Sequence, residues 1–269
     1  MKKLTMIAVC LFTVVMTASA RADEQTDPLH SPVWKDAAKK LFGEASYVYD
    51  DRVIVLVPAV VENQAQVPVT ADARGVPNVQ KLIVYADLNP IQHVLTFTPA
   101  QSKAAPFVSF RMKVEQATPV RAAALTSDGV WHVGGVFLEA SGGGCSSPAT
   151  ARGDADWTDT VGNAQGRIWR EADGGARLRL RVRHPMDTGL AKTNTPAFYI
   201  EKFEMKSATG DPLATIEMFE PVSEDPTVTM LLRPKATDAS VSIDGRDNNG
   251  TLYRAVVPLP WHQSALEVR

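Results

Sequence analysis

The stretch Arg177-Leu178-Arg179-Leu180-Arg181-Val182-Arg183 alternates strictly between charged and apolar side chains. Such a period of two residues is typical of a β-strand with one buried and one exposed face, because successive side chains of a strand point to opposite sides of the sheet. The remainder of the chain repeats this texture in short β-branched runs broken by Pro, Gly, Asn and Asp. The sequence therefore predicts an all-β fold.

Strands are expected in two groups, one on each side of a change in composition. Hairpin turns are indicated by Ser127-Asp128-Gly129 and by Asp247-Asn248-Asn249-Gly250. Short strands at this spacing predict two small β-sandwiches in series. The expected strands are Arg52–Val57, Val67–Ala73, Lys81–Ala86, Val94–Thr98, Phe107–Val114, Val120–Thr126 and Val130–Ala140, then Arg177–Arg183, Ala197–Lys206, Leu213–Phe219, Thr227–Leu232, Ser240–Asp244 and Leu252–Leu259.

Two segments depart from the β pattern. Residues 32–42 predict a short amphipathic helix, with Ser31 as its N-cap and Gly43 as its stop. From residue 142 to 166 the chain is rich in Gly, Ser, Thr, Ala and Asp, which is typical of a boundary between domains. We therefore expect one domain at residues 32–145, a flexible linker at 146–165 and a second domain at 166–262.

The N-terminus has the order of a secretory signal peptide: Lys2 and Lys3, then an apolar run, then small residues up to Ala22. The apolar run is shorter than the about 20 residues that span a bilayer. We expect cleavage near Ala22, export to the periplasm and no membrane insertion.

The charge of the chain argues against nucleic acid as a partner. The net charge is −2, and removing the three basic residues Lys2, Lys3 and Arg21 with the leader takes it to about −5. Binding to phosphates requires a concentrated basic face. With 45% hydrophobic residues, the chain has enough apolar side chains for one large core or two small ones.

Cys145 follows Gly142, Gly143 and Gly144, and the other cysteine, Cys10, lies in the expected signal peptide. The mature chain would thus hold one thiol, which cannot form an intramolecular disulfide. A run of three glycines does not build a core around a side chain. The sequence therefore predicts an exposed, reactive thiol on a mobile arm formed by these glycines.

Other constellations point to structure rather than to catalysis. The four arginines of 177–183 read first as a solvated face, then as a docking surface, and last as a site for an oxyanion. His184 beside Pro185 is more typical of a shaped turn, and turn chemistry accounts for residues 244–250 better than a calcium loop does. The sequence holds no metal-ligand spacing, nucleophile elbow or phosphate-binding loop, so we expect no cofactor, no metal and no active site.

Several motifs, taken together and in order, resemble two families of bacterial thiosulfate oxidation. The first half resembles SoxY, the sulfur-carrier subunit, and the second half resembles SoxZ, its partner subunit. The motifs that carry the SoxY resemblance are residues 58–63, 67–69, 83–90, 97–99 and 142–145; those for SoxZ are residues 182–189, 196–200 and 244–250. The chain resembles a fused SoxYZ-like carrier, a group associated with periplasmic quinoprotein (PQQ-dependent) dehydrogenase systems.

The resemblance implies a fold, a site and a set of partners. The fold would be two immunoglobulin-like sandwiches packed as a pseudo-heterodimer. Cys145 would be the covalent attachment point for sulfur intermediates, which disulfide chemistry can load and release. The partners would be periplasmic enzymes or cytochromes of sulfur oxidation, with a quinoprotein dehydrogenase as a further candidate.

The position of Cys145 departs from the family pattern. SoxY ends in a free arm with glycines on both sides of its cysteine, whereas here Ser146-Ser147-Pro148 follows and the chain continues. A loop that enters a partner brings two backbones, about 5 Å apart at strand-pair spacing. Either the partner's cleft is open or the linker is cut after Cys145 to free an arm.

Three functions remain open from the sequence. The first is a covalent sulfur carrier. The second is a non-covalent accessory or docking protein of a PQQ-dependent alcohol (methanol) dehydrogenase system, with a vestigial cysteine. The third is a redox-dependent dimer joined by a disulfide between two copies of Cys145.

Overall fold

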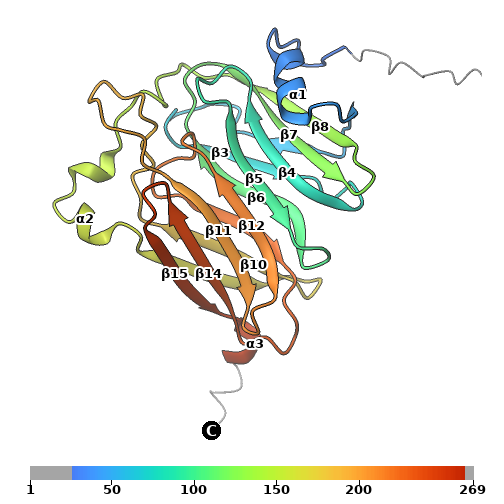
Figure 1. The fold of residues 1–269 in the computed structure, drawn as a ribbon, viewed down its shortest axis with the longest axis vertical. Coiled ribbons are helices and arrows are strands. Elements are labelled where there is room, and N and C mark those ends of the chain that lie inside the picture. Colours follow the sequence, from blue (N-terminus) through green and yellow to red (C-terminus); the bar gives the residue numbers. More distant parts are fainter. Residues whose placement is uncertain (1–25, 264–269) are drawn as a thin grey trace, which may run out of the picture.

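The computed structural model describes residues 26–263, so the expected signal peptide at residues 1–22 lies outside the described residues. The described part is mostly strand (Figure 1). In chain order the elements are α1 (Trp34–Phe42), β1 (Tyr47–Tyr49), β2 (Ile54–Leu56), β3 (Val67–Asp72), β4 (Val79–Ala86), β5 (His93–Pro99), β6 (Ala104–Met112), β7 (Thr118–Thr126), β8 (Trp131–Leu138), the 3-10 helix η1 (Thr150–Gly153), α2 (Trp157–Thr160), β9 (Ala164–Arg170), β10 (Ala176–Val182), β11 (Ile200–Ser207), β12 (Pro212–Met218), β13 (Thr227–Leu232), β14 (Ser240–Asp247), β15 (Leu252–Pro258) and α3 (Pro260–Gln263).

The strands form two layers. The nine-stranded sheet has the order β1-β8-β7-β4-β5-β12-β11-β14-β15, and the six-stranded sheet has the order β2-β3-β6-β13-β10-β9. Neighbouring strands are antiparallel except β1, which runs parallel to β8. Each half of the chain contributes one end of both layers. The predicted fold class, two immunoglobulin-like β-sandwich domains in tandem with a short N-terminal helix, is confirmed.

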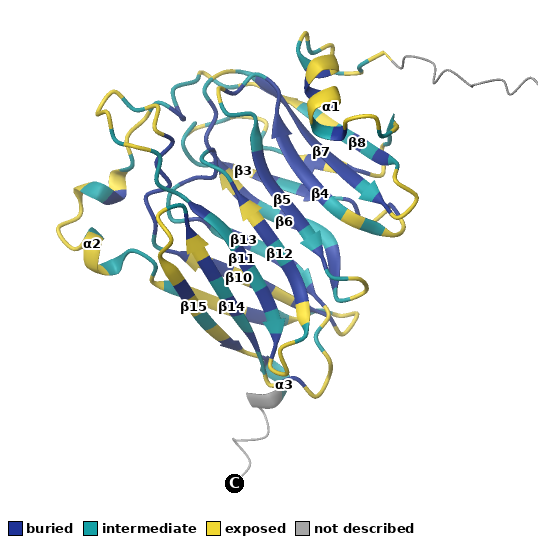
Figure 2. Ribbon diagram, in the orientation of Figure 1, coloured by how far each residue is buried: buried dark blue, intermediate teal, exposed yellow. Residues whose placement is uncertain are grey.

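Both sheets run without interruption through the junction between the two halves. In one layer β5 pairs with β12, and in the other β6 pairs with β13. One cluster of buried side chains continues across this junction. Figure 2 marks buried residues in dark blue on the strands of both halves. Unpaired edge strands expose rows of N–H and C=O groups, and the cross-junction pairs satisfy these groups. The sequence predicted two sandwiches but gave no sign that their sheets would merge.

The structure confirms the predictions that rested on a clear alternation of apolar and charged residues or on a clear turn motif. The inward side chains of β10, from Ala176 to Val182, are buried, and its arginines are exposed. Gly129 and Gly250 take positive φ values of 84° and 85° in the two expected hairpin turns, a region that glycine adopts at little cost.

The helix α1 lies on the outer face of the nine-stranded sheet, over β4, β7 and β8. Its buried residues include Trp34 and Phe42, and the Phe42 ring stacks on Trp131 with centroids 4.7 Å apart. Gly43 ends the helix as predicted, but the predicted N-cap is wrong. Val33 occupies that position without a side-chain cap, and the Asp27 carboxylate instead accepts the backbone N–H of Ser31.

The sequence missed two strands. The three residues of β1 are too few to show a period. In β9 only Ile168 is buried, so polar residues hide the alternation. The structure also places η1 and α2 between residues 146 and 163, so the expectation of a flexible, structureless linker is not met there. No described helix is long and apolar enough to cross a membrane.

Candidate functional site

The glycines before Cys145 form a tight turn against the end of β6. The backbone N–H groups of Gly143 and Gly144 donate to the carbonyls of Glu115 and Val114, at 3.3 and 2.9 Å. Gly142 and Gly143 have φ values of +96° and +87°, and a Cβ on Gly144 would lie 2.1 Å from the Gln64 carbonyl oxygen. These glycines allow close backbone contact. The expectation that they form a mobile arm is not met in this arrangement.

Cys145 itself is completely buried, which corrects the prediction of an exposed thiol. Its Sγ lies 3.6 Å from the carbonyl oxygen of Lys113, in the first half of the chain. Its own carbonyl accepts a 2.6 Å hydrogen bond from Thr188 Oγ1, in the second half. The thiol therefore lies at the junction of the two sandwiches, held from both sides.

Lys113 is a buried charged neighbour that sequence reasoning missed. Its side chain is 4% exposed, and Nζ donates to the carbonyl of Met186, two residues before Thr188. Burial lowers the pKa of Lys113 to about 8. A lysine at the end of an expected strand reads as solvated, so the sequence carried no signal for this position.

The environment of Cys145 keeps it in the thiol form. Burial and, to a smaller extent, the charge of Glu115 raise its pKa, the charge of Lys113 lowers it, and the net result is a pKa of about 12. The thiolate is the nucleophilic form of cysteine. At neutral pH the buried thiol is therefore unreactive.

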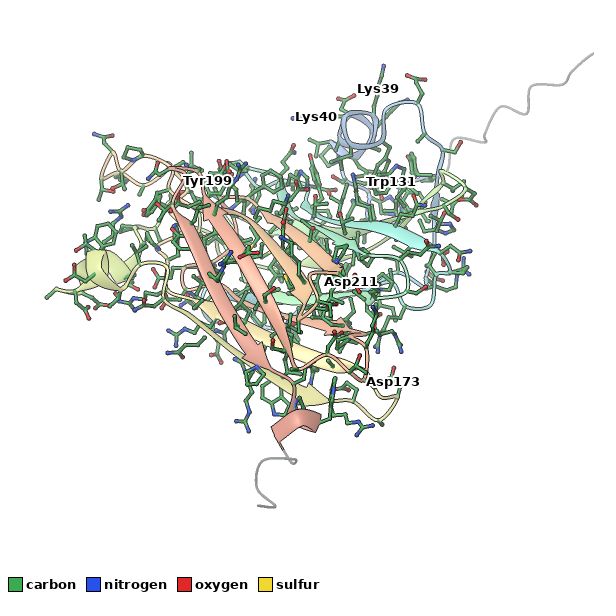
Figure 3. The ribbon with its side chains drawn as sticks, turned by 60° about the horizontal axis from the view of Figure 1, so that its bottom comes forward. Lys39, Lys40, Trp131, Asp173, Tyr199 and Asp211 are labelled. Atoms are coloured by element: carbon green, nitrogen blue, oxygen red, sulfur yellow. The ribbon has the colours of Figure 1, made fainter. Side chains whose placement is uncertain are left out.

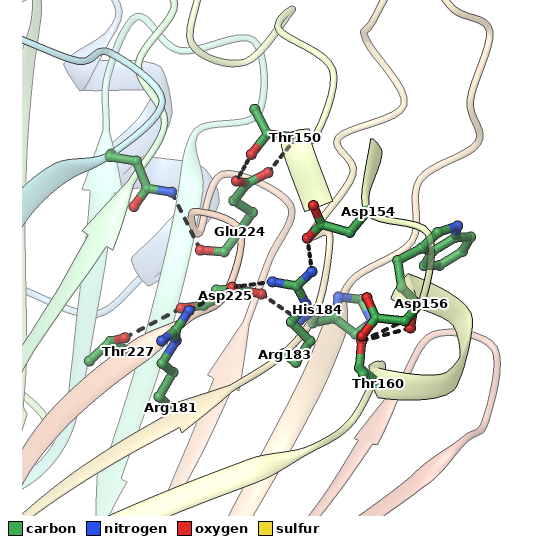
Figure 4. A network of polar contacts seen from close by, with 12 residues as sticks. Thr150, Asp154, Asp156, Thr160, Arg181, Arg183, His184, Glu224, Asp225 and Thr227 are labelled. Carbon is green, nitrogen blue, oxygen red and sulfur yellow. Dashed lines mark hydrogen bonds and ion pairs between the residues drawn. The ribbon is translucent and has the colours of Figure 1, made fainter. Parts of the chain in front are cut away.

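The segment after Cys145, residues 146–163, is bound along its length, and we call it the strap. Ser146 donates from its backbone N–H and its hydroxyl to the Glu115 carboxylate, at 3.0 and 2.8 Å. Further along, the Thr150 backbone N–H donates to Glu224 at 2.7 Å. Asp154 forms an ion pair with Arg183 (Figure 4).

Arg152 gives the strap its most buried anchor. Its Nε donates to the carboxylate of Asp187 at 2.8 Å, and Asp187 is 5% exposed. The guanidinium also lies over the ring of Trp157, 4.5 Å from its centroid. Side chains of the strap and of the second half of the chain thus hold the turn at Cys145 against the second half.

His184 is structural, as the sequence suggested. It is completely buried, its Nδ1 accepts the backbone N–H of Met186 at 3.0 Å, and its ring packs on Phe198 with centroids 4.3 Å apart. Burial lowers the pKa of His184 to about 4, so the ring is neutral at physiological pH. Its role is to shape the turn that carries Met186 and Thr188.

The loop at residues 244–250 is also a turn rather than a cation site. The Asp247 carboxylate accepts the backbone N–H groups of Asn249 and Thr251, each at 2.9 Å, and the hydroxyl of Tyr253. Within residues 26–263 no group of three His, Cys, Asp or Glu side chains is placed to hold a metal ion.

Comparisons with known proteins agree with the two halves seen in the fold. The family described as sulfur oxidation protein SoxY matches residues 38–145, and the family described as sulphur oxidation protein SoxZ matches residues 168–258. None of the curated proteins compared matches the chain.

Two solved structures show weak likeness. The sulfur carrier protein SoxY from Chlorobium limicola f thiosulfatophilum is 20% identical over 40% of this chain and 90% of its own, with a TM-score of 0.36. A β-glycosidase from Bacteroides vulgatus is 9% identical over 78% of this chain and 25% of its own, with a TM-score of 0.22. The family matches carry the assignment: the chain belongs to the SoxY and SoxZ families, carrier and accessory proteins of sulfur oxidation rather than enzymes, joined here in one fused SoxYZ-like protein.

Proposed function

We propose that this chain is a periplasmic carrier that holds sulfur intermediates covalently on Cys145 and presents them to partner enzymes. One observation carries the proposal: the SoxY match ends at Cys145, and this residue lies at the junction of the SoxY and SoxZ halves, beside the buried Lys113. Export rests on the sequence of residues 1–22.

The arrangement described here corresponds to a stowed state of the carrier. With a pKa of about 12, the buried thiol would be thiolate in only about one molecule in 100,000 at neutral pH. Once released into water, an ordinary cysteine is a few per cent thiolate. Loading therefore requires that the contacts to Thr188 and Glu115 open first.

Loading by exchange needs no external oxidant. The released Cys145 thiolate attacks the terminal sulfur of a persulfide on a partner, so that one S–S bond forms on Cys145, the partner's S–S bond breaks, and its electron pair leaves with the partner thiolate. Joining thiosulfate directly to the thiol instead releases two electrons and one proton. That route requires an electron acceptor, such as a partner cytochrome.

The strap decides how Cys145 can reach a partner. While the strap is intact, residues on both sides of Cys145 must move together as a loop. Cleavage after Cys145 would instead free a chain end at that residue. The contacts of Ser146, Thr150, Arg152 and Asp154 fix the strap along its length, which favours opening as a unit.

The test is the intact mass of the protein isolated from the periplasm without reductant, and again after reduction. A reducible adduct of sulfane or thiosulfate mass that is absent from Cys145→Ser supports the carrier. A free thiol that stays unchanged with thiosulfate and periplasmic extract contradicts it. The same spectrum gives the cleavage site of the leader and shows whether the strap is cut.

The burial of Cys145 favours one second candidate. A non-covalent accessory of a PQQ-dependent alcohol dehydrogenase system would not need a reactive thiol, and a completely buried cysteine suits that role. It predicts that Cys145→Ser leaves dehydrogenase activity in cells unchanged. A dimer joined by Cys145 would first require the same release, and it would appear as a doubled mass that halves on reduction.

A further inference from the structure

The outer face of β9 and β10 carries a cluster of cations that the stowed cysteine does not use. The antiparallel register sets Arg177 opposite Trp169 and Arg179 opposite Arg167, so these side chains share one face of the sheet. Arg181 continues the same column on β10. We call these five residues the arginine face.

Part of this charge is not neutralised. Arg177 is paired with Glu171, and Arg181 with Asp225, each at 2.9 Å. Among residues 26–263, by contrast, Arg167 and Arg179 have no ion pair, although both are exposed. Like charges directly opposite each other in a sheet are destabilising. The fold therefore keeps an unfavourable pair of cations at the centre of this face.

The neighbouring residues hold the face ready for a ligand. The guanidinium groups of Arg167 and Arg177 lie 5.2 and 5.1 Å from the centroid of the Trp169 ring, which restricts their motion. On the other side β13 sets Thr229 opposite Arg179 and Leu231 opposite Arg177, and it adds no acid to the face. The surface is a sheet face rather than a closed pocket.

We propose that the arginine face is the docking site for an acidic surface patch of a partner protein. Planar guanidinium groups match carboxylates in pairs, and complementary charge steers partners together. Because the whole chain has a net charge of −2, this concentration of positive charge is local. The inference rests on the proposed function, since a carrier must dock with the enzymes that load and unload it.

The position of the arginine face fits this role. Beyond Val182 the chain of β10 continues directly to the turn that holds Met186 and Thr188 against Cys145. Asp225 is shared between Arg181 on the face and Arg183, which also binds Asp154 of the strap (Figure 4). An acidic partner on this face would lie beside the strap and compete with Asp154 and Asp225 for the same guanidinium groups.

The test measures binding of fluorescent poly-L-glutamate to the full mature chain at low and at near-physiological ionic strength. The variant R167Q/R179Q should bind about tenfold more weakly, because two exposed ion pairs together contribute about a factor of ten. The control K39Q/K40Q removes the same charge from exposed positions on α1 (Figure 3) and should bind like the wild type. Circular dichroism checks folding, and R167Q/R179Q should melt no lower than the wild type.

Three outcomes would overturn the inference. If R167Q/R179Q and the wild type bind poly-L-glutamate with equal affinity, the arginine face does not take part in binding. If K39Q/K40Q loses as much affinity as R167Q/R179Q, the loss reflects net charge and not the arginine face. Preferential binding to phosphatidylglycerol vesicles, lost in R167Q/R179Q, would assign the face to a membrane. The Cys145 adduct is measured by mass on the wild-type chain, whose arginine face is intact, so failure of docking and failure of the carrier function are separate results.

Discussion

Replacing Thr188 with valine should release Cys145 from its stowed position. Thr188 Oγ1 donates to the Cys145 carbonyl at 2.6 Å and accepts the Leu190 backbone N–H at 3.1 Å. Valine has nearly the same shape but no hydroxyl, so the buried Cys145 carbonyl loses its donor. In the released state water supplies that donor. A net hydrogen bond contributes about 1 kcal/mol, so the released population should rise about fivefold.

The rate of alkylation by iodoacetamide, followed by intact mass, measures this population. The stowed thiol is nearly all protonated, and the observed rate is therefore the released fraction multiplied by the reactivity of a free cysteine. Thr188→Val should react about fivefold faster than the wild type at neutral pH. Thr188→Ser keeps the hydroxyl and should react like the wild type.

Two results would refute this reasoning. If Thr188→Val and the wild type react at the same rate, the hydroxyl does not hold the cysteine turn. If the rate keeps rising with pH toward about 12 instead of levelling near about 8.5, the buried thiol itself reacts and no release is involved.

Three further changes test other contacts of the site and of the fold around it. Gly144→Ala would place its Cβ 2.1 Å from the Gln64 carbonyl oxygen. The substitution should therefore lower the free energy of unfolding by about 1–3 kcal/mol and expose the Cys145 thiol. An unchanged melting temperature and an unchanged alkylation rate would contradict this. Lys113→Met removes a buried cation whose pKa is lowered from 10.5 to about 8, a shift that corresponds to about 3 kcal/mol. Because the substitution also loses the hydrogen bond to Met186, it should stabilise the protein by about 1–2 kcal/mol at pH 7. A lower free energy of unfolding in urea would contradict this. Burial lowers the pKa of His93 and of His184 from 6.5 to about 4, so between these pH values the unfolded chain binds more protons than the folded chain. Each histidine should therefore cost up to about 3 kcal/mol of stability as the pH falls from 6.5 to 4. A free energy of unfolding that does not change in this pH window would contradict the prediction.

The fold was predictable because its signals are local. The alternation of residues 177–183 and the turn at Asp247–Gly250 depend only on neighbours in the chain, and both appear where expected. The pairing of β5 with β12 and of β6 with β13 joins strands far apart in sequence. No local pattern specifies which edges meet, so the merged sheets could not be inferred.

The site was harder to predict because its decisive contacts are tertiary. Three glycines suggested mobility, yet Gly144 is needed for its close approach to Gln64. The burial of Cys145 depends on Lys113 from one half and Thr188 from the other. A sequence shows the identity of such residues but not that they meet.

Tethering Cys145 at both ends sets a fixed radius for its chemistry. Residues 139–145 separate it from the end of β8 at Leu138, and seven residues at full extension span about 23–25 Å. The strap on the other side of Cys145 is longer, so it does not shorten the distance that Cys145 can travel. In the proposed carrier function, an enzyme that exchanges cargo with an uncut chain must bring its reaction centre inside this sphere, through an opening wide enough for a doubled backbone. The length of this seven-residue tether thus limits the partners of an uncut chain to those whose reaction centre lies near an open surface, whatever specific contacts they make.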